Sequence, residues 1–322
     1  MKPFVRPARQ RGVAVITALL LTALAITVVA SLFWQQQVQV RSMENQRLRL
    51  QTQWAMRGMV DFARFWLRQD NPSLTALDGV WATPIEEARL DDYVDREKVD
   101  TEKFDATVSG RALDAQARFN ITNLATATGI VSQPYVQAYQ RLLSNLQLDS
   151  SLAQATADAV LRARPKPRSA GNDGKTPAAP AATGGGSEPV AFTQIEDLLA
   201  VPGYTPQIIE KLRDFIIVLP ELTPVNVNTA PAEVLAAVTM LSLSEASALT
   251  LSNPRKKFVD KLNFQNNINA ALIEGIELDV KSRYFLTVIR VRLDRAALDA
   301  VALVNRKTDP QRTTSLVWLR EN

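Results

Sequence analysis

The sequence predicts an α+β fold in which a long N-terminal helix packs on an antiparallel sheet, with a large all-helical domain inserted between two blocks of strands. Three observations predict it: an apolar run that continues as a proline-free helix, two blocks of alternating residues, and helical periodicity between those blocks. The expected segments are a basic leader 1–12, the long helix 13–70, a sheet region 71–124 and 279–322, and the inserted domain 125–278, which includes a linker 164–189.

The first element is an uncharged run of 22 residues, Val13 to Trp34. About 20 apolar residues suffice to cross a bilayer, so this run predicts a transmembrane helix over 13–34. Four basic residues and no acid precede it: Lys2, Arg6, Arg9 and Arg11. This flank predicts that the rest of the chain lies outside the cytoplasm. A secretory signal peptide is the alternative, but its small residues follow the apolar run, whereas Gly12 precedes it.

The helix is expected to continue well beyond the membrane, because Gln35 to Gln69 contains no proline and only one glycine. Its full length would be about 85 Å at 1.5 Å per residue, so its second half needs something to pack on. An apolar stripe recurs at helical spacing: Leu48, Ala55, Met59, Phe62 and Trp66. This stripe predicts packing on the chain's own domain, with a partner's groove as the alternative. The helix should end before Pro72.

Strands are predicted in two blocks on either side of the helical insert. In the first, 104–113 and 115–124 alternate around Asp114 and predict a hairpin, after a turn-rich stretch 71–103. In the second, 283–293, 298–305 and 313–319 predict a three-stranded meander, rich in β-branched and aromatic residues.

Between these blocks, six segments show 3.6-residue periodicity: 134–148, 151–164, 192–200, 207–218, 231–240 and 262–276. The linker 164–189 holds ten Pro or Gly among 26 residues and no Leu, Ile, Val, Met or aromatic residue. Such a segment cannot bury enough apolar area to offset its ordering entropy, so it is predicted to be flexible.

Composition argues against most catalysis. The chain has no histidine and no cysteine, which removes the usual zinc ligand sets and the Ser-His-Asp and Cys-His arrangements. We therefore expect no enzyme. A carboxylate-based hydrolase stays as an alternative, although no convincing acid pair is evident.

Nucleic acid is also not expected as a partner. Beyond the leader the chain carries 33 basic and 33 acidic residues, so it lacks the surplus that duplex binding needs. The stretch Leu198 to Gly203 resembles one hairpin of a helix-hairpin-helix module, but its second glycine is missing. It is interpreted as a helix connector.

Two polar motifs are interpreted as structural. In Val225 to Pro231, Asn and Thr side chains are expected to cap backbone groups near the start of the next helix. The Asn and Thr side chains of Phe119 to Leu124 are expected to do the same at the end of the second strand. An acidic segment could supply oxygen ligands for calcium, but it lacks the spacing of an EF-hand loop and is expected to be a solvated face. Its acids are Asp91, Asp92, Asp95, Glu97, Asp100 and Glu102.

The leader carries a family resemblance. A short basic segment ending in Arg11-Gly12, followed by Val13 and a long apolar helix, resembles the type IV prepilin class. That class carries glutamate as the fifth mature residue, where this chain has Thr17. This departure, the helical insert and the run Leu222 to Ala230 are similar to the GspK family of minor pseudopilins of the type II secretion system. The resemblance covers almost the whole mature chain.

The resemblance implies a pilin-like fold and a position at the tip of a periplasmic pseudopilus, whose assembly the chain would initiate and cap. It implies that prepilin peptidase cuts between Gly12 and Val13 and methylates the new amine of Val13. The implied partners are the minor pseudopilins I and J, with exported proteins at the same tip. The implied location is the inner membrane, with one pass and a periplasmic domain. No cofactor is required, and calcium stays open.

Thr17 has a physical reading in this setting. A carboxylate inside the bilayer costs about 2.5 to 3.5 kcal/mol on insertion scales, unless it meets the charged amino terminus of a neighbour. A subunit with no neighbour above it has no such amine to meet. The alternative is a single-pass anchored periplasmic binding domain that never assembles into a fibre.

Overall fold

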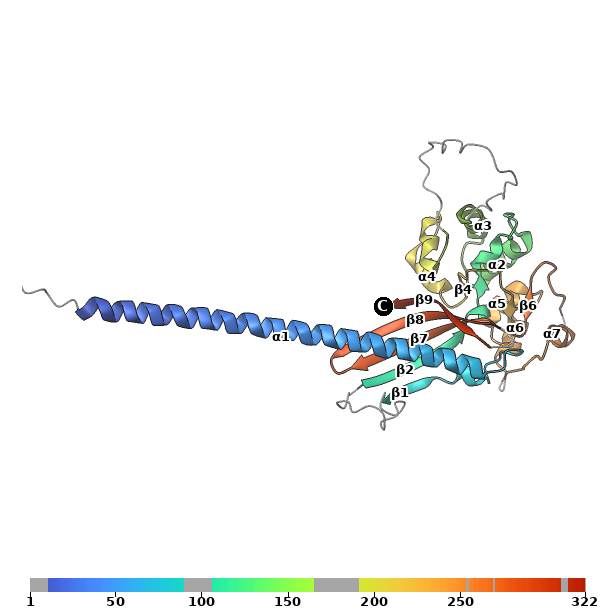
Figure 1. Cartoon of the computed structure of the whole chain (residues 1–322). Coiled ribbons are helices and arrows are strands. Elements are labelled where there is room, and N and C mark those ends of the chain that lie inside the picture. The colour runs from blue at the N-terminus through green and yellow to red at the C-terminus, as the bar shows by residue number, and fades with distance from the viewer. Residues whose placement is uncertain are drawn as a thin grey trace, which may run out of the picture.

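The computed structural model describes residues 11–89, 106–164, 191–252, 255–268, 270–307 and 312–321. Its longest element is helix α1, Arg11–Gln69, a rod whose first half projects away from the rest of the molecule (Figure 1). By length and composition α1 could cross a membrane. The helix predicted over 13–69 is therefore confirmed, and it ends just before Asn71 and Pro72.

A five-stranded sheet lies against the second half of α1, with the order β1-β2-β7-β8-β9 and antiparallel pairing throughout. Its strands are β1 (Ile85–Arg89), β2 (Ala106–Asp114), β7 (Tyr284–Leu293), β8 (Ala296–Arg306) and β9 (Thr314–Glu321). The predicted meander is confirmed as β7 to β9. Strand β1 was not predicted, because it is short and holds only Ile85 and Ala88 as apolar residues.

The predicted hairpin around Asp114 is wrong. Its first arm is β2, but β2 pairs with β1 and β7, and the chain turns at Asp114 into a 3₁₀ helix, Ala115–Ala117. The Asp114 side chain accepts a hydrogen bond from the Gln116 amide, which holds that turn. The second arm supplies only β3, Phe119–Asn120, and a further 3₁₀ helix, Ile121–Leu124.

The residues between Asp114 and β7 form a helical insert. Its α-helices are α2 (Gln133–Asn145), α3 (Leu152–Ala163), α4 (Pro206–Leu212), α5 (Ala232–Val238), α6 (Leu243–Thr250) and α7 (Lys261–Asn267). The insert also contains two short parallel strand pairs. These are β3 with β4 (Ile216–Ile217), and β5 (Val225–Asn226) with β6 (Leu278–Asp279).

The predicted insert helices are present with three changes. Segment 262–276 is helical only as far as Asn267, where α7 ends. Segment 192–200 contains a 3₁₀ helix, Ile195–Ala200, and 207–218 splits into α4 and β4. Helix α6 was missed, although Ser242 and Glu245 form a capping box at its start that the sequence carries. The linker 164–189 lies outside the described residues except for Arg164.

The two faces of the sheet have different coverings. Side chains of β2, β7 and β8 that include Val108, Ile289 and Ala302 pack against Met56 and Met59 of α1. On the opposite face, Leu286 and Leu303 pack against Ile217 and Leu219 of the insert. The insert has its own larger core, which includes Phe119, Ile121 and Leu124. These three residues therefore belong with the helices and not with the sheet to which the sequence assigned them.

Candidate functional site

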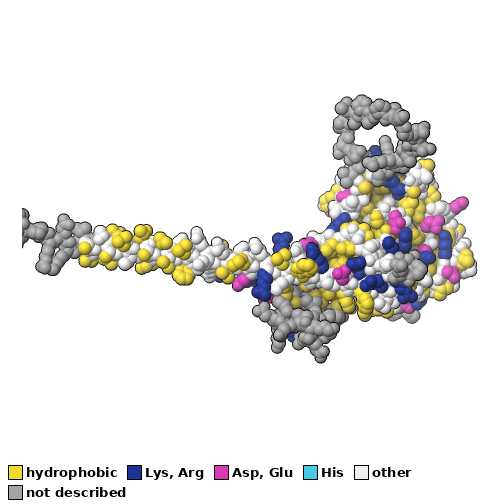
Figure 2. All heavy atoms as spheres, viewed as in Figure 1, with side chains coloured by type: hydrophobic (Ala, Val, Ile, Leu, Met, Phe, Trp, Pro, Cys, Tyr) yellow, Lys and Arg dark blue, Asp and Glu magenta, His cyan; other side chains and the backbone are white. Residues whose placement is uncertain are grey.

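The first half of α1 exposes apolar side chains on all sides. From Val15 to Trp34 its large apolar residues are at least half exposed, and Trp34 reaches 71%. Figure 2 shows this part of the rod as an almost continuous apolar surface, followed by a paler polar section. The sheet and the insert follow, and together they are called the head. A surface of this kind requires lipid or other apolar helices around it.

Thr17 lies inside this apolar surface. Its hydroxyl donates a hydrogen bond to the carbonyl oxygen of Ala14 at 3.0 Å, and Thr22 and Thr27 bond back in the same way. A hydroxyl satisfied within its own helix needs no partner in the membrane. The predicted cleavage position, Gly12 and Val13, falls in the first turn of α1. Its processing stays a prediction.

The second half of α1 packs on the chain's own sheet, as predicted, but through a slightly different stripe. Met59 is buried, and Ala55 and Phe62 are partly buried. Trp66 lies at the margin with 36% of its surface exposed, and it donates from Nε1 to the carbonyl oxygen of Val80 at 3.0 Å. The fully buried positions that the prediction omitted are Thr52, Met56, Val60 and Leu67.

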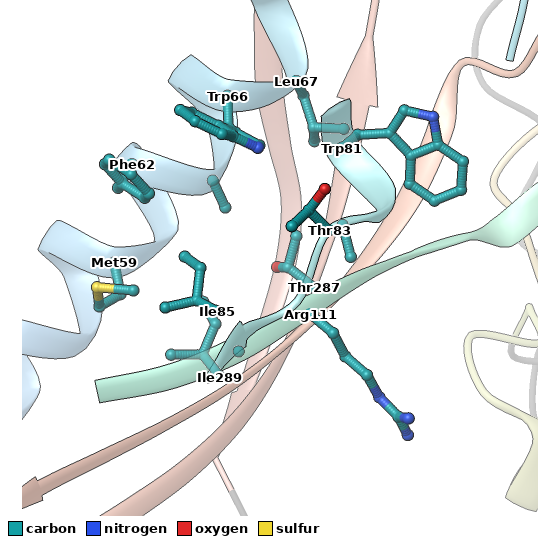
Figure 3. Close-up of a pocket in the computed structure, with 13 residues that line it drawn as sticks. Met59, Phe62, Trp66, Leu67, Trp81, Thr83, Ile85, Arg111, Thr287 and Ile289 are labelled. Carbon is teal, nitrogen blue, oxygen red and sulfur yellow. The ribbon is translucent and has the colours of Figure 1, made fainter. Parts of the chain in front are cut away.

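A small cavity of about 40 Å³ lies in this seam between α1 and the sheet. Figure 3 shows Met59, Phe62 and Trp66 of α1 facing Ile85 and Ile289 across it. The volume admits a water-sized probe and no cofactor, since ligand pockets usually measure about 300 to 1,000 Å³. The seam is therefore a packing contact that fixes the helix on the sheet.

A buried polar cluster joins the sheet to the insert at the end of β2. The Oδ2 atom of Asp114 accepts hydrogen bonds from Asn226 Nδ2 at 2.8 Å, Thr229 Oγ1 at 2.6 Å and Ser282 Oγ at 2.7 Å. Its Oδ1 atom accepts from the Gln116 amide at 2.8 Å. One carboxylate thus ties together β2, β5 and the entry to β7.

Burial raises the pKa of the Asp114 carboxyl above its usual value, and the four donors act against that shift. A raised pKa means that the folded state binds the proton more tightly than the unfolded state does. The stability that this proton contributes is present at low pH and is lost as the pH rises from the unfolded pKa through the folded one. The four donors limit that loss.

A buried ion pair lies beside this cluster. Arg306 of β8 and Asp70, the residue after α1, are 1% and 8% exposed, and Arg306 Nη1 lies 3.0 Å from Asp70 Oδ2. Arg306 Nη2 also donates to Thr75 Oγ1 and to the carbonyl oxygen of Ser282. The guanidinium covers the ring of Phe285 with its carbon 4.6 Å from the ring centroid. The end of α1 is thereby fixed to the sheet and the insert together.

The Asn side chains of Val225 to Pro231 bind backbone groups as predicted, but mainly those of distant segments, whereas Thr229 donates to the Asp114 carboxylate. Asn226 Oδ1 also accepts locally from the Asn228 amide. Asn226 Nδ2 donates to the carbonyl oxygen of Thr75, and Asn228 exchanges two hydrogen bonds with the backbone of Phe258. The start of α5, at Pro231, has no side-chain cap. The motif is a joint between segments and does not start the next helix.

The acidic segment Asp91 to Glu102, expected to be a solvated face, lies outside the described residues, so the question of calcium stays open. Within the described ranges, no group of three or more His, Cys, Asp or Glu residues could hold a metal ion. Gly203 of the predicted connector has φ +98° and joins the 3₁₀ helix Ile195–Ala200 to α4, and an added Cβ would lie 2.6 Å from Leu152. Its geometry is that of a connector.

Comparisons with known proteins agree with one another. Two family models, both described as type II secretion system protein K, match residues 117–221 and 225–283, together about half of the chain. A Pseudomonas aeruginosa protein described as type II secretion system protein K is 27% identical over 326 residues, covering 93% of this chain and 90% of that protein.

A solved structure is similar as well. It is the crystal structure of the GspK-GspI-GspJ complex from the enterotoxigenic Escherichia coli type 2 secretion system, and the match covers 87% of this chain and 99% of that chain. The TM-score is 0.66 and the sequence identity 19%, so this likeness establishes the fold alone.

Proposed function

Because the chain belongs to the protein K family of type II secretion systems, we propose that it is the minor pseudopilin at the tip of the pseudopilus, where it initiates and caps assembly. The observation that carries the proposal is the position of the insert. The helical insert lies at the opposite end of α1 from the apolar half (Figure 1). A head of this bulk, above a rod anchored in the membrane, leaves no room for a further subunit on top.

The role is binding and not catalysis. The apolar half of α1 would first anchor the chain in the inner membrane, with the soluble head in the periplasm, and then pack among neighbouring helices. The partners are the minor pseudopilins I and J, since the similar E. coli protein was solved in complex with GspI and GspJ. Copurification of both with the full chain from membranes would support this, and their absence would favour an anchored binding domain unrelated to pili.

Replacing Gly12 with valine should leave the leader attached. Prepilin peptidase must fit the residue before the cut into its site, and a branched side chain there blocks access. Mass spectrometry of the full-length chain should find Met1 retained in Gly12→Val, whereas the wild type begins at a methylated Val13. Gly58→Ala, in the exposed and open part of the same helix, is the control and should be processed normally. A Gly12→Val chain that still begins at Val13 would contradict the proposed processing.

Replacing Thr17 with glutamate should impair tip function, because an unpaired carboxylate in the membrane costs about 2.5 to 3.5 kcal/mol. Secretion should fall at least tenfold, since 1.4 kcal/mol already corresponds to about a factor of ten. Thr17→Ser keeps the back-bonded hydroxyl and should secrete normally. If Thr17→Glu secretes like the wild type and cross-links to subunits both above and below it, the tip position is wrong.

A further inference from the structure

A second surface of the head lies on the face of the sheet that α1 does not cover. There a cleft of about 400 Å³ opens between β7, β8 and β9 on one side and segments 193–196 and 213–214 of the insert on the other. This volume falls within the range of ligand-binding pockets, about 300 to 1,000 Å³. We call it the sheet–insert cleft.

Four arginines line the sheet–insert cleft: Arg320 of β9 lies over its floor, and the other three come from the sheet and the insert. Arg111 comes from β2, Arg118 precedes β3, and Arg213 follows α4. Figure 3 shows the Arg111 side chain pointing away from α1, toward the opposite side of the sheet. Arg213 is paired with Glu196 at 2.9 Å and with Glu210 at 3.0 Å. Among the described residues, Arg111 has no ion pair, and Arg118 has only a long one with Asp214.

Arg118 is the least satisfied of them. Its side chain is only 16% exposed, and its nearest acid, Asp214, lies 3.6 Å away and is itself 83% exposed. Burial lowers the pKa of Arg118, and the charges of Arg111 and Arg213 lower it further, whereas Asp214 acts in the opposite direction. A guanidinium in such a place costs free energy unless an anion approaches it.

Other arginines of the head differ in this respect. Arg164 donates to the carbonyl oxygens of Thr126 and Thr122, and Arg255 donates to those of Val227 and Ala230. Arg306 has the buried carboxylate of Asp70. The Arg118 amide donates to the carbonyl oxygen of Ala115, but its guanidinium donates no hydrogen bond within the described part of the chain. The other three arginines donate to carbonyl or carboxylate oxygens, although the Nε atom of Arg306 is buried without a partner, whereas the guanidinium of Arg118 has only the long contact with Asp214 at the wall of a cleft.

The floor of the sheet–insert cleft is apolar. Leu113, Val288 and Val301 line it, together with the ring of Trp318. Arg320 covers that ring at 4.2 Å and donates to the carbonyl oxygen of Thr193 at 2.9 Å, which joins the end of β9 to the insert. An inorganic anion would leave this floor empty. A fitting ligand combines a carboxylate with apolar side chains next to it.

We propose that the sheet–insert cleft binds a peptide segment of another protein, with an acidic side chain on Arg118 and Arg111 and a neighbouring apolar side chain on Val288, Val301 and Trp318. The proposal goes beyond the tip function and does not depend on it, because the site is formed within one head. It gives the head a specific polypeptide-binding site in addition to the helix contacts that build a fibre.

The test uses the full-length chain in detergent and a fluorescein-labelled peptide of sequence Gly-Leu-Glu-Val-Asp-Leu-Gly, followed by fluorescence anisotropy. Saturable binding is expected, weakened by salt, and at least about tenfold weaker for a peptide with Gln and Asn in place of the acids, as for a lost charge-assisted contact. Arg118→Gln should raise the Kd by a similar factor. Arg111→Gln alters an exposed side chain, so it keeps the test valid if Arg118→Gln does not fold.

Arg292→Gln is the matched control, since Arg292 is an exposed arginine of β7 that pairs with Glu87 outside the cleft. Its Kd should equal that of the wild type. The proposal is overturned if no saturable binding appears up to millimolar peptide, if the cleft variants bind like the control, or if phosphate competes as well as the unlabelled peptide does.

Discussion

Replacing Asp114 with alanine is expected to lower the free energy of unfolding by about 3 to 5 kcal/mol, because several buried donors lose their acceptor and each unsatisfied donor costs about 1 to 3 kcal/mol. Asp114 accepts hydrogen bonds from Asn226, Thr229, Ser282 and the Gln116 amide. Alanine leaves a cavity and these buried donors lose their common acceptor. Thermal denaturation of the full-length chain in detergent, followed by circular dichroism, should show a melting temperature lower by about 10 °C.

Two further variants define the cause. Asp114→Asn keeps the shape and one acceptor oxygen, so it should cost less than alanine does. Asp299→Ala removes an exposed carboxylate from its pair with Arg290 and should change stability by less than about 1 kcal/mol. If Asp114→Ala melts like Asp299→Ala, the cluster does not hold the insert to the sheet.

Replacing Arg306 with methionine is expected to destabilise the head by a similar amount, about 3 to 5 kcal/mol, because it leaves the Asp70 carboxylate buried without its cation. The contact with Phe285 and the hydrogen bonds to Thr75 and Ser282 are lost as well. The measurement is again the melting temperature of the full chain.

The double variant Asp70→Leu/Arg306→Met separates the ion pair from the other contacts. Removing both charges leaves no unpaired carboxylate, so the double variant should be more stable than the sum of the single effects predicts, by about 0.5 to 3 kcal/mol. Strict additivity would mean that the two side chains do not interact across the end of α1.

Local periodicity was enough to predict the long helix, the meander and the helical character of the insert, because each pattern extends over many residues. It failed where one residue decides the path of the chain. Asp114 stands between two alternating runs and reads as a hairpin turn, yet its carboxylate is buried and turns the chain into the insert. Periodicity alone does not show which polar side chain the fold buries.

The joint between sheet and insert was only half visible in the sequence. The motif predicted that Asn226 and Asn228 bind backbone groups, but it could not identify their acceptors, Thr75 and Phe258, which are distant along the chain. The residues next to Arg306 and Asp70 in the sequence do not distinguish them from solvated charges. Pairing between two residues so far apart along the chain depends on the tertiary fold. Arg118 was missed for the same reason.

The pairing of β2 with β7 has a consequence for how this architecture arose. Asp114, where the chain leaves the sheet, is the register partner of Phe285, where it has just returned. In topological terms the whole helical insert is one long connection between adjacent antiparallel strands. An ancestral sheet could acquire it without changing the order or register of any strand, and a tight reverse turn at the same rung would close the gap if it were excised.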